Sequence, residues 1–296
     1  MSTGTSRVAL GAAALVATSL LWGSSFPAIK VVVESIGGSN YVWMRAAIAL
    51  AVLAPIVVLD AARGRLIRAS IVGGLAAGIA YTLGLWFQGV GTGLTTASNS
   101  AFITGLNVVI VHFYSATVLR SYTGSLLASL LLSLAGLWLL TRPAGGPNVG
   151  DILVLIGSFF WAAQVVIVSK YSSSANPLHF TFFQIAPSTL LALASIPQVL
   201  AGNPPKMDLR TGLVLAYLGI ACTVIAFALQ VYGQRYISPA SAATIFLLEP
   251  PAAAILSMLL LGERMEFIQM VGGALILMSM YIAVREEFRA RGTHAK

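Results

Sequence analysis

Ten apolar stretches, each of about 20 residues, divide almost the whole chain, and only short polar connections separate them. A helix that rises about 1.5 Å per residue crosses a hydrocarbon core of about 30 Å with such a stretch. Because a bilayer offers no water to unpaired backbone groups, the spans are expected to be α-helices. The predicted spans are 8–30, 41–59, 69–90, 96–117, 122–141, 151–170, 178–200, 210–233, 239–261 and 266–284.

The composition excludes a soluble domain. Hydrophobic residues make up 58% of the chain and charged residues 9%, whereas soluble domains carry about 25% charged residues. The longest connections, around 143–150 and 202–209, are turns rich in Gly and Pro, so no separate nucleotide-binding domain is expected. The single cysteine, Cys222, lies within a span and cannot form an intramolecular disulfide. We expect no metal site and no cofactor.

The basic residues predict the orientation. If the chain starts inside and alternates sides, eleven basic residues face the cytoplasm and four, Arg142, Lys206, Arg210 and Arg264, face out. Lys30 and Arg45 are set aside because they lie within or at the outer ends of their spans, and counting them as outside leaves eleven against six. The eleven are Arg7, Arg63, Arg65, Arg68, Arg120, Lys170, Arg235, Arg285, Arg289, Arg291 and Lys296. We therefore expect a multi-pass protein of the bacterial inner membrane with both termini in the cytoplasm. The net charge of +8 is then explained by the membrane topology and by the attraction of basic residues to anionic lipid headgroups. Nucleic acid is not an expected partner.

The chain also shows an internal repeat. One constant offset pairs Gln88 with Gln230 and Asn107 with Glu249, and a slightly shorter offset pairs Trp22 with Trp161 and Arg45 with Gln184. These matches predict two five-helix halves, residues 1–145 and 146–296. Because each half has an odd number of spans, the second half must be inverted relative to the first. Inverted repeats are typical of carriers that work by alternating access. The predicted fold is an all-α integral membrane protein whose ten helices surround a central cavity.

Several motifs resemble those of the EamA branch of the drug/metabolite transporter superfamily. They are the run LWGSSFP at 21–27, ASAATIFLLEP at 240–250, LLLGERM at 259–265, and Gly272-Gly273. The resemblance covers nearly the whole chain. It implies ten spans in two repeats, cytoplasmic termini, a central substrate cavity, and export of amino acids, metabolites or drugs. The chain looks most like the exporters of amino acids, including aromatic ones.

Two departures from the family pattern stand in the first half of the chain. Arg120-Ser121 occupies the place that Gly262-Glu263 has in the second half, and Val108 replaces the pattern's proline in the fourth span. The two halves therefore match the pattern unequally.

Polar residues form stripes along the predicted helices. Ser100, Thr104 and Asn107 recur along one face of the fourth span, as i, i+4 and i+7 positions do. Polar side chains that face a bundle interior mark solute paths or helix contacts, and both readings stay open. The substrate-binding candidates are Trp22, Ser25, Tyr81, Gln88, Asn99, Ser100, Thr104, Asn107, Trp161, Gln164, Phe183, Gln184, Gln230, Ser241, Thr244 and Glu249.

Two basic residues, Lys30 and Arg45, lie toward the outer ends of their spans. Each is expected to bind a substrate carboxylate at the cavity mouth or to extend its charge to the membrane surface. Tyr41, beside them in sequence, is expected in the interfacial aromatic belt.

Glu249 is the only acidic residue in the interior of a span, and Pro250-Pro251 follow it. Such an acid next to a broken helix is a candidate site for a proton, a cation or a substrate ammonium group, or it is a structural carboxylate at a kink. Since Asn107 occupies the equivalent position, we expect hydrogen bonding to matter more than ionisation there. Transport should then persist, though impaired, in a Glu249→Gln variant, with solute moving down its own gradient.

The expected function is export of small organic solutes, most of all aromatic or hydrophobic amino acids, with drugs or other metabolites as the alternative. The expected partners are a small-molecule substrate and the lipid bilayer, and the chain is expected to work as a monomer. An intramembrane enzyme is the rival class, since His112 and His179 could pair with a serine such as Ser125 or Ser158, but no glycine-rich loop accompanies those serines. A channel is the third class, disfavoured because no ring of charges or filter loop is evident.

Overall fold

The computed structural model describes residues 3–95, 97–141, 148–202, 205, 207–261 and 266–293, and every regular element in them is a helix. The first half holds α1 Thr3–Ile36, α2 Gly38–Ala62, α3 Arg68–Thr92, α4 Ala97–Gly105, α5 Asn107–Thr117 and α6 Gly124–Thr141. The second holds α7 Val149–Ser172, α8 Pro177–Ile185, the 3₁₀ helix η1 Ala186–Ser195, α9 Ile196–Leu200, α10 Leu209–Gly219, the π-helix η2 Ile220–Ile225, α11 Ala226–Gly233, α12 Pro239–Phe246, α13 Glu249–Leu261 and α14 Phe267–Thr293.

Polar capping residues begin several of these helices. The Asn148 side chain accepts a hydrogen bond from the Asp151 backbone N–H at the start of α7, and the Asp151 carboxylate accepts one from the Asn148 backbone, which completes a capping box. Asp208 caps α10, and the hydrogen bonds that it accepts from Thr211 hold the pKa of its carboxyl below the ordinary value. Short polar connections thus set where the apolar helices start.

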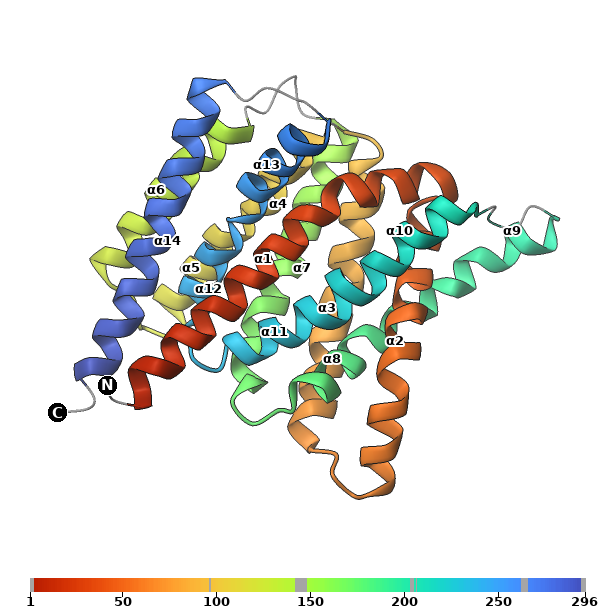
Figure 1. The fold of residues 1–296 in the computed structure, drawn as a ribbon, viewed down its shortest axis with the longest axis horizontal. Helices are drawn as coiled ribbons and strands as arrows, with labels where there is room; N and C mark the ends of the chain where they lie inside the picture. The colour runs from red at the N-terminus through yellow and green to blue at the C-terminus, as the bar shows by residue number, and fades with distance from the viewer. Residues whose placement is uncertain are drawn as a thin grey trace.

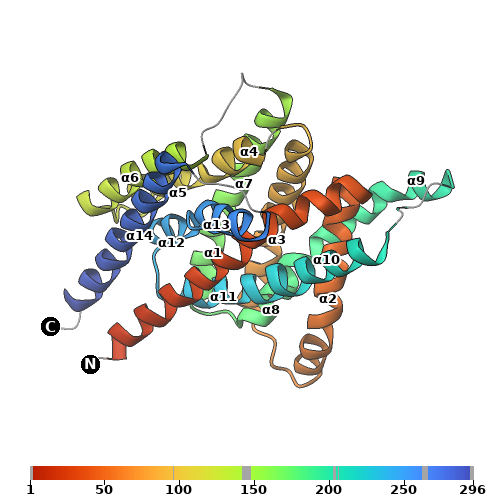
Figure 2. The same ribbon diagram turned by 45° about the horizontal axis from the view of Figure 1, so that its top comes forward.

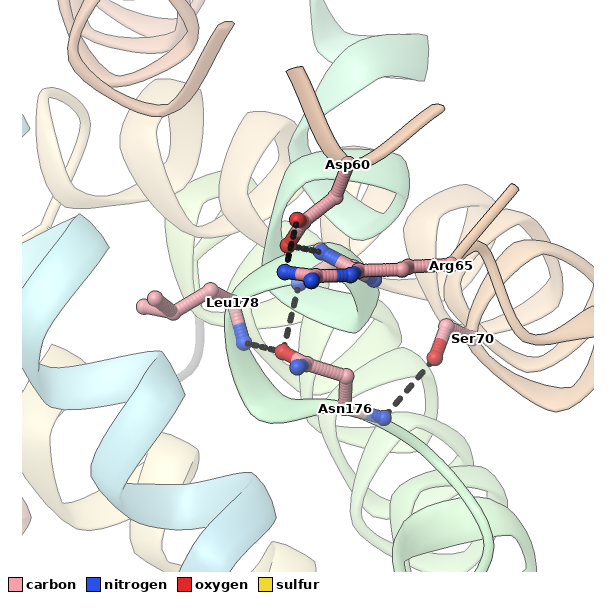
Figure 3. Close-up of polar contacts among 6 residues, drawn as sticks. Asp60, Arg65, Ser70, Asn176 and Leu178 are labelled. Carbon is pink, nitrogen blue, oxygen red and sulfur yellow. Dashed lines mark hydrogen bonds and ion pairs between the residues drawn. The ribbon is translucent and has the colours of Figure 1, made fainter. Parts of the chain in front are cut away.

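Asn176 caps α8 and links it to the first half of the chain. Its side-chain oxygen accepts from the backbone N–H groups of Leu178 and His179, while its own backbone N–H donates to the Ser70 hydroxyl at the start of α3 over 2.8 Å (Figure 3). Pro177 occupies the first turn of α8, where its missing N–H costs nothing.

The helical prediction is confirmed for the described residues, and the helix lengths agree with a multi-pass membrane protein. Nine helical stretches there are long and apolar enough to cross a membrane: 6–25, 38–62, 68–92, 124–141, 149–172, 177–195, 209–233, 239–256 and 267–290. The predicted span 96–117 differs, because the helix is interrupted at Leu106 and its apolar part, Phe102–Thr117, is shorter than the nine stretches above. The inverted ten-helix repeat stays a prediction.

The helices form one bundle in which α4–α5 and α12–α13 run between α1 on one side and the α6–α14 pair on the other (Figures 1 and 2). α3 packs along α7, and α1 packs along both α11 and α13. The start of α1 and the end of α14 lie at the same end of the bundle (Figure 1). Both described ends of the chain therefore lie on one side of the helix bundle.

Glycines allow the closest of these helix contacts. A Cβ atom built on Gly136 of α6 would lie 2.6 Å from the carbonyl oxygen of Gly272 in α14, and one built on Gly91 of α3 would lie 2.8 Å from the carbonyl oxygen of Gly150 in α7. Inside a bilayer the hydrophobic effect does not drive helices together. Close backbone packing of this kind is therefore a main source of the attraction between helices.

Polar contacts join α2 to the α8–η1 segment at both ends. At one end, the Asn40 side-chain oxygen accepts a hydrogen bond from Ser195 over 2.6 Å. At the other end, His179 Nε2 lies 3.1 Å from an Asp60 carboxylate oxygen, and Arg65 pairs with the same carboxylate at 3.6 Å (Figure 3). These contacts hold α2, and with it Arg45, in a fixed position against the second half of the chain.

One apolar cluster runs from the end of the bundle where the chain starts, past the helix interruptions at Leu247 and Leu248, to Leu140 near the end of α6. Val8, Leu15, Val111 and Ile237, among others, are fully or almost fully buried there. At the end where the chain starts, buried apolar side chains from α1, α5 and the segment before α12 thus pack together.

The glycine contact between α6 and α14 predicts a contrast between two neighbouring glycines. Gly272→Ala should lower the thermal unfolding midpoint of the purified protein, because the new methyl group would meet backbone atoms of Gly136 and Leu140 within 2.6 Å; overpacking of this kind costs about 1–3 kcal/mol. Gly273→Ala is the control, since nothing lies within 4 Å of its Cβ position. An equal effect of both substitutions would contradict the proposed packing role.

Candidate functional site

A central cavity lies between the two halves of the chain and is lined by residues of both. Helices α1, α2, α3, α4, α5, α7, α11, α12 and α13 contribute to its wall, whereas α6 and α14 do not. Its lining is formed by Trp22, Ser25, Ile29, Arg45, Leu85, Gln88, Thr104, Asn107, Trp161, Gln164, Val165, Phe227, Phe246 and Glu249. A mostly apolar cleft with a few polar groups is the usual form of a small-molecule site.

Half of the residues predicted from the sequence line this cavity. They are Trp22, Ser25, Arg45, Gln88, Thr104, Asn107, Trp161, Gln164 and Glu249. The side chain of Lys30 lies outside the described part of the structure. Arg142, Lys206, Arg264 and the Gly262-Glu263 pair also fall outside it.

The other predicted residues do not line the cavity, because each side chain is engaged elsewhere. Ser100 bonds Thr92 over 2.6 Å, Asn99 reaches Asp151, and Ser241 bonds Ser238. Thr244 bonds His112 over 3.0 Å, and Phe183 packs against Gly74 of α3. These positions serve helix contacts.

Tyr81, Gln184 and Gln230 form a second layer behind the cavity wall. Gln164, which reaches the cavity, donates to Gln184 over 3.1 Å and exchanges two hydrogen bonds of 3.0 Å with Gln230. All three glutamines are at most 1% exposed. Because the amide of Gln164 is bonded on both its oxygen and its nitrogen, it fixes the position of α7 and has little capacity left for a ligand.

Arg45 is the most unusual group in the wall. Its side chain is 3% exposed and donates three hydrogen bonds: from Nε to Thr223 Oγ1 over 2.5 Å, from Nη2 to the Cys222 carbonyl over 3.0 Å, and from Nη1 to the Tyr41 hydroxyl. No described carboxylate pairs with it. The guanidinium is thus oriented but not neutralised, and a buried charge of this kind in a membrane protein is a functional candidate by default.

A local change of helix type makes this arrangement possible. Residues 220–225 form a π-helix between α10 and α11, and such bulges shift backbone carbonyls out of the regular hydrogen-bond ladder. The Cys222 carbonyl accepts from Arg45 and also from Trp22 Nε1 over 3.2 Å. One displaced carbonyl therefore positions both the cation and an aromatic ring of the cavity.

Aromatic rings form much of the remaining wall. Trp22 lies against Phe227 and Phe246 with ring centroids 4.9 and 5.2 Å apart, and Tyr81 packs edge-on against Trp161 at 5.9 Å. The indole Nε1 of Trp161 is buried without a partner among the described atoms. This wall suits a flat apolar group.

Glu249 and Asn107 complete the charged and polar groups of the cavity. Both side chains are partly buried, and neither makes a hydrogen bond or ion pair with another described residue. Glu249 does not pair with Arg45, although both groups line the same cavity. The cavity therefore holds one cation and one acid that are separate from each other.

Among the described residues, neither His112 nor His179 has a serine as its hydrogen-bond partner, and His179 instead lies against Asp60. His112 contacts Tyr122 and Thr244, and Ser158 donates to backbone carbonyls of Ile103 and Val154. Within the described residues, no three His, Cys, Asp or Glu side chains lie close enough together to hold a metal ion.

Sequence reasoning missed two kinds of site residue. The apolar lining residues Ile29, Leu85, Val165, Phe227 and Phe246 look like ordinary core residues, although Phe227 lies one turn before Gln230 and so shares its face. Tyr41 is fully buried against Arg45, which corrects its expected place in an interfacial belt. The burial of Arg45 likewise excludes the reading in which its charge reaches the membrane surface.

Comparisons with known proteins point to one family. The profile of the EamA-like transporter family matches residues 9–142 and again residues 148–285. An uncharacterized transporter of Archaeoglobus fulgidus is 31% identical over 271 residues, covering 90% of this chain and 83% of that protein. The uncharacterized inner membrane transporter YedA of Escherichia coli K12 is 25% identical over 281 residues, covering 91% and 89%. A crystal structure with a TM-score of 0.73 and 18% identity, covering 96% of this chain and 98% of the other, has a similar fold.

The hydrogen bonds of Arg45 predict coupling between two substitutions. Thr223→Val should lower the thermal unfolding midpoint, because a buried Nε–H loses its acceptor; an unsatisfied buried group costs about 1–3 kcal/mol. In an Arg45→Met background, the same Thr223→Val change should have a much smaller effect, since the buried cation is gone. Four proteins measured by thermal unfolding in one detergent complete this double-mutant cycle. Strictly additive effects would show that the Arg45–Thr223 bond does not hold the guanidinium.

Proposed function

Because the chain belongs to the EamA-like transporter family, and is therefore a membrane transporter, we propose that it exports amino acids with aromatic or hydrophobic side chains by alternating access. Membership of the family supports membrane transport. The proposed substrate class is argued from the residues that line the cavity. The relatives carry no assigned substrate in their names.

One observation supports the substrate class most: the cavity combines an unpaired guanidinium and an unpaired carboxyl group with an aromatic wall. A free amino acid has a carboxylate, an ammonium group and, in this class, a flat apolar side chain. Arg45 would bind the carboxylate, and Trp22, Phe227 and Phe246 would contact the side chain. A solute with a carboxylate and an ammonium group gives both Arg45 and Glu249 a partner, which a neutral or singly charged drug does not achieve.

The packing at the end of the bundle where the chain starts is consistent with one of the two states of a carrier. Packed apolar residues such as Val8 and Leu15 fill the end where the chain starts. A smaller cavity bordered by Ile29, Tyr41 and Thr92 leads from the central space toward the opposite end. With the termini in the cytoplasm, as the basic residues predict, the central cavity would open outward and the packed end would form the cytoplasmic gate.

Counterflow in proteoliposomes tests the proposed substrate class. Vesicles loaded with unlabelled tryptophan, phenylalanine or leucine should take up the labelled amino acid transiently and saturably, because a carrier exchanges its solute across both faces. Uptake should not require an imposed pH gradient if the solute moves down its own gradient. Exchange of nucleotide sugars or drugs without any amino acid would contradict the proposal. Current at single-channel rates would indicate a pore, and chemically altered solute an enzyme.

The orientation makes a separate prediction. In a Cys222→Ala background, single cysteines placed by Ser2→Cys and Lys296→Cys should resist an impermeant thiol reagent in intact cells and react after the cells are opened. Met207→Cys is the matched control, since Met207 precedes α10 at a predicted outer loop and is 46% exposed; it should react in intact cells. Labelling of either terminal position in intact cells would overturn both the orientation and the inverted arrangement of the halves.

A further inference from the structure

Helix interruptions occur at corresponding places in the two halves of the chain. α4 ends at Gly105 and α5 begins at Asn107, while α12 ends at Phe246 and α13 begins at Glu249. At each interruption the backbone closes tighter turns, with Leu106 N–H bonded to the Ile103 carbonyl over 3.1 Å and Leu248 N–H to that of Ile245 over 3.0 Å. The sequence offset that pairs Gln88 with Gln230 also pairs Asn107 with Glu249.

The two side chains at these interruptions face a common space. Asn107 and Glu249 both line the central cavity, and both also line a smaller cavity between the two interrupted helices, together with Thr104 and Pro250. Among the residues that the structure describes, neither side chain has a hydrogen-bond or ion-pair partner. Polar groups at this depth that lack protein partners are expected to bind something else.

Several of the residues around this space carry groups that can accept a hydrogen bond. Pro250 and Pro251 have no N–H, so the carbonyls of Phe246 and Leu247, four residues earlier, lack their helical donors. Both of those residues border the smaller cavity. Together with the Asn107 amide oxygen and the Glu249 carboxyl group, these carbonyls give the residues around the smaller cavity several acceptor oxygens and one acidic group. The matching ligand has several N–H donors and a positive charge.

Aromatic neighbours favour an organic cation over a bare metal ion. Trp22 and Phe246 line the same cavity and pack together with ring centroids 5.2 Å apart. Aromatic faces attract ammonium groups by cation–π interaction and tolerate the carbon atoms attached to them. A sodium ion would instead require a closed shell of oxygens, which an aromatic wall does not supply.

We propose that Asn107 and Glu249 together form a subsite for the ammonium group of the transported solute. This inference rests on the proposed amino-acid function and assigns the orientation of the solute: the ammonium group lies at the helix interruptions and the carboxylate at Arg45. In an inverted repeat, equivalent residues of the two halves meet near the axis that relates them. The ammonium group therefore keeps the same two partners whichever half of the carrier is open.

Three matched probes test this subsite in purified protein reconstituted in nanodiscs. L-phenylalanine carries both charges, phenethylamine only the ammonium group, and 3-phenylpropionate only the carboxylate. By calorimetry, wild type should bind the two amines, and Glu249→Gln should weaken both by about tenfold, which corresponds to about 1.4 kcal/mol. Binding of 3-phenylpropionate should not weaken. Glu266→Gln, at an exposed position next to α14, is the control that should change none of the three affinities.

A charge swap separates a shared subsite from a structural carboxylate. The double variant Asn107→Asp/Glu249→Asn moves the acid to the equivalent position of the other half, and it should recover amine binding to within a few-fold of wild type. Amine binding that stays as weak as in Glu249→Gln, in a double variant with the unfolding midpoint of wild type, would overturn the shared subsite. So would equal weakening of all three probes by Glu249→Gln, or the absence of amine binding by wild type.

These outcomes are distinguishable from those that test the proposed function. If phenethylamine binds in a Glu249-dependent way but no amino acid is exchanged in counterflow, the ammonium subsite stands and the amino-acid assignment fails. If amino acids are exchanged but Glu249→Gln does not weaken the binding of the amines relative to 3-phenylpropionate, the proposed function stands and the subsite fails.

Discussion

The organisation of the central cavity depends on a buried guanidinium that is held by hydrogen bonds but not neutralised. Arg45 donates to Tyr41, Thr223 and the Cys222 carbonyl, so neutral dipoles alone compensate its charge. Removing a full charge from water costs several kcal/mol even in a relaxed protein interior. A site that retains such a group is organised to receive an anion, and the separate acid of Glu249 makes the cavity complementary to a solute with both charges.

The same contacts connect the charge to the aromatic wall and to the helix framework. The Cys222 carbonyl, displaced within the π-helix η2, accepts from both Arg45 and Trp22. Behind the opposite wall, the hydrogen bonds among Gln164, Gln184 and Gln230 fix α7 against α8 and α11. Packed and hydrogen-bonded elements do not deform continuously. A change between two access states must therefore either move the hydrogen-bonded helices together as rigid units or break the hydrogen bonds between them.

The sequence predicted the helices well because length and hydropathy alone decide which segments can cross a bilayer. It also identified Asn107, Gln88 and Glu249 as interior polar groups, since a 3.6-residue period shows which residues share a face. The period does not show which neighbour that face meets, and so Ser241 and Thr244, which serve helix contacts, looked equivalent to Thr104. The π-helix at 220–225 has no recognisable sequence signal, and without it the burial of Tyr41 against Arg45 could not be foreseen. The break at Leu106 was missed because Val108 stands where the family pattern has proline.

The central claim is that a zwitterionic solute lies between Arg45 and the pair of helix interruptions, and an experimental structure with a bound amino acid tests it most directly. The ligand should be one that the protein exchanges in counterflow. The account predicts a carboxylate within hydrogen-bond distance of the Arg45 guanidinium, an ammonium group between Asn107 and Glu249, and a side chain against Trp22 and Phe246. A ligand bound in the reverse orientation, or a cavity in which Arg45 and Glu249 close on each other as an ion pair beside the ligand, would contradict it.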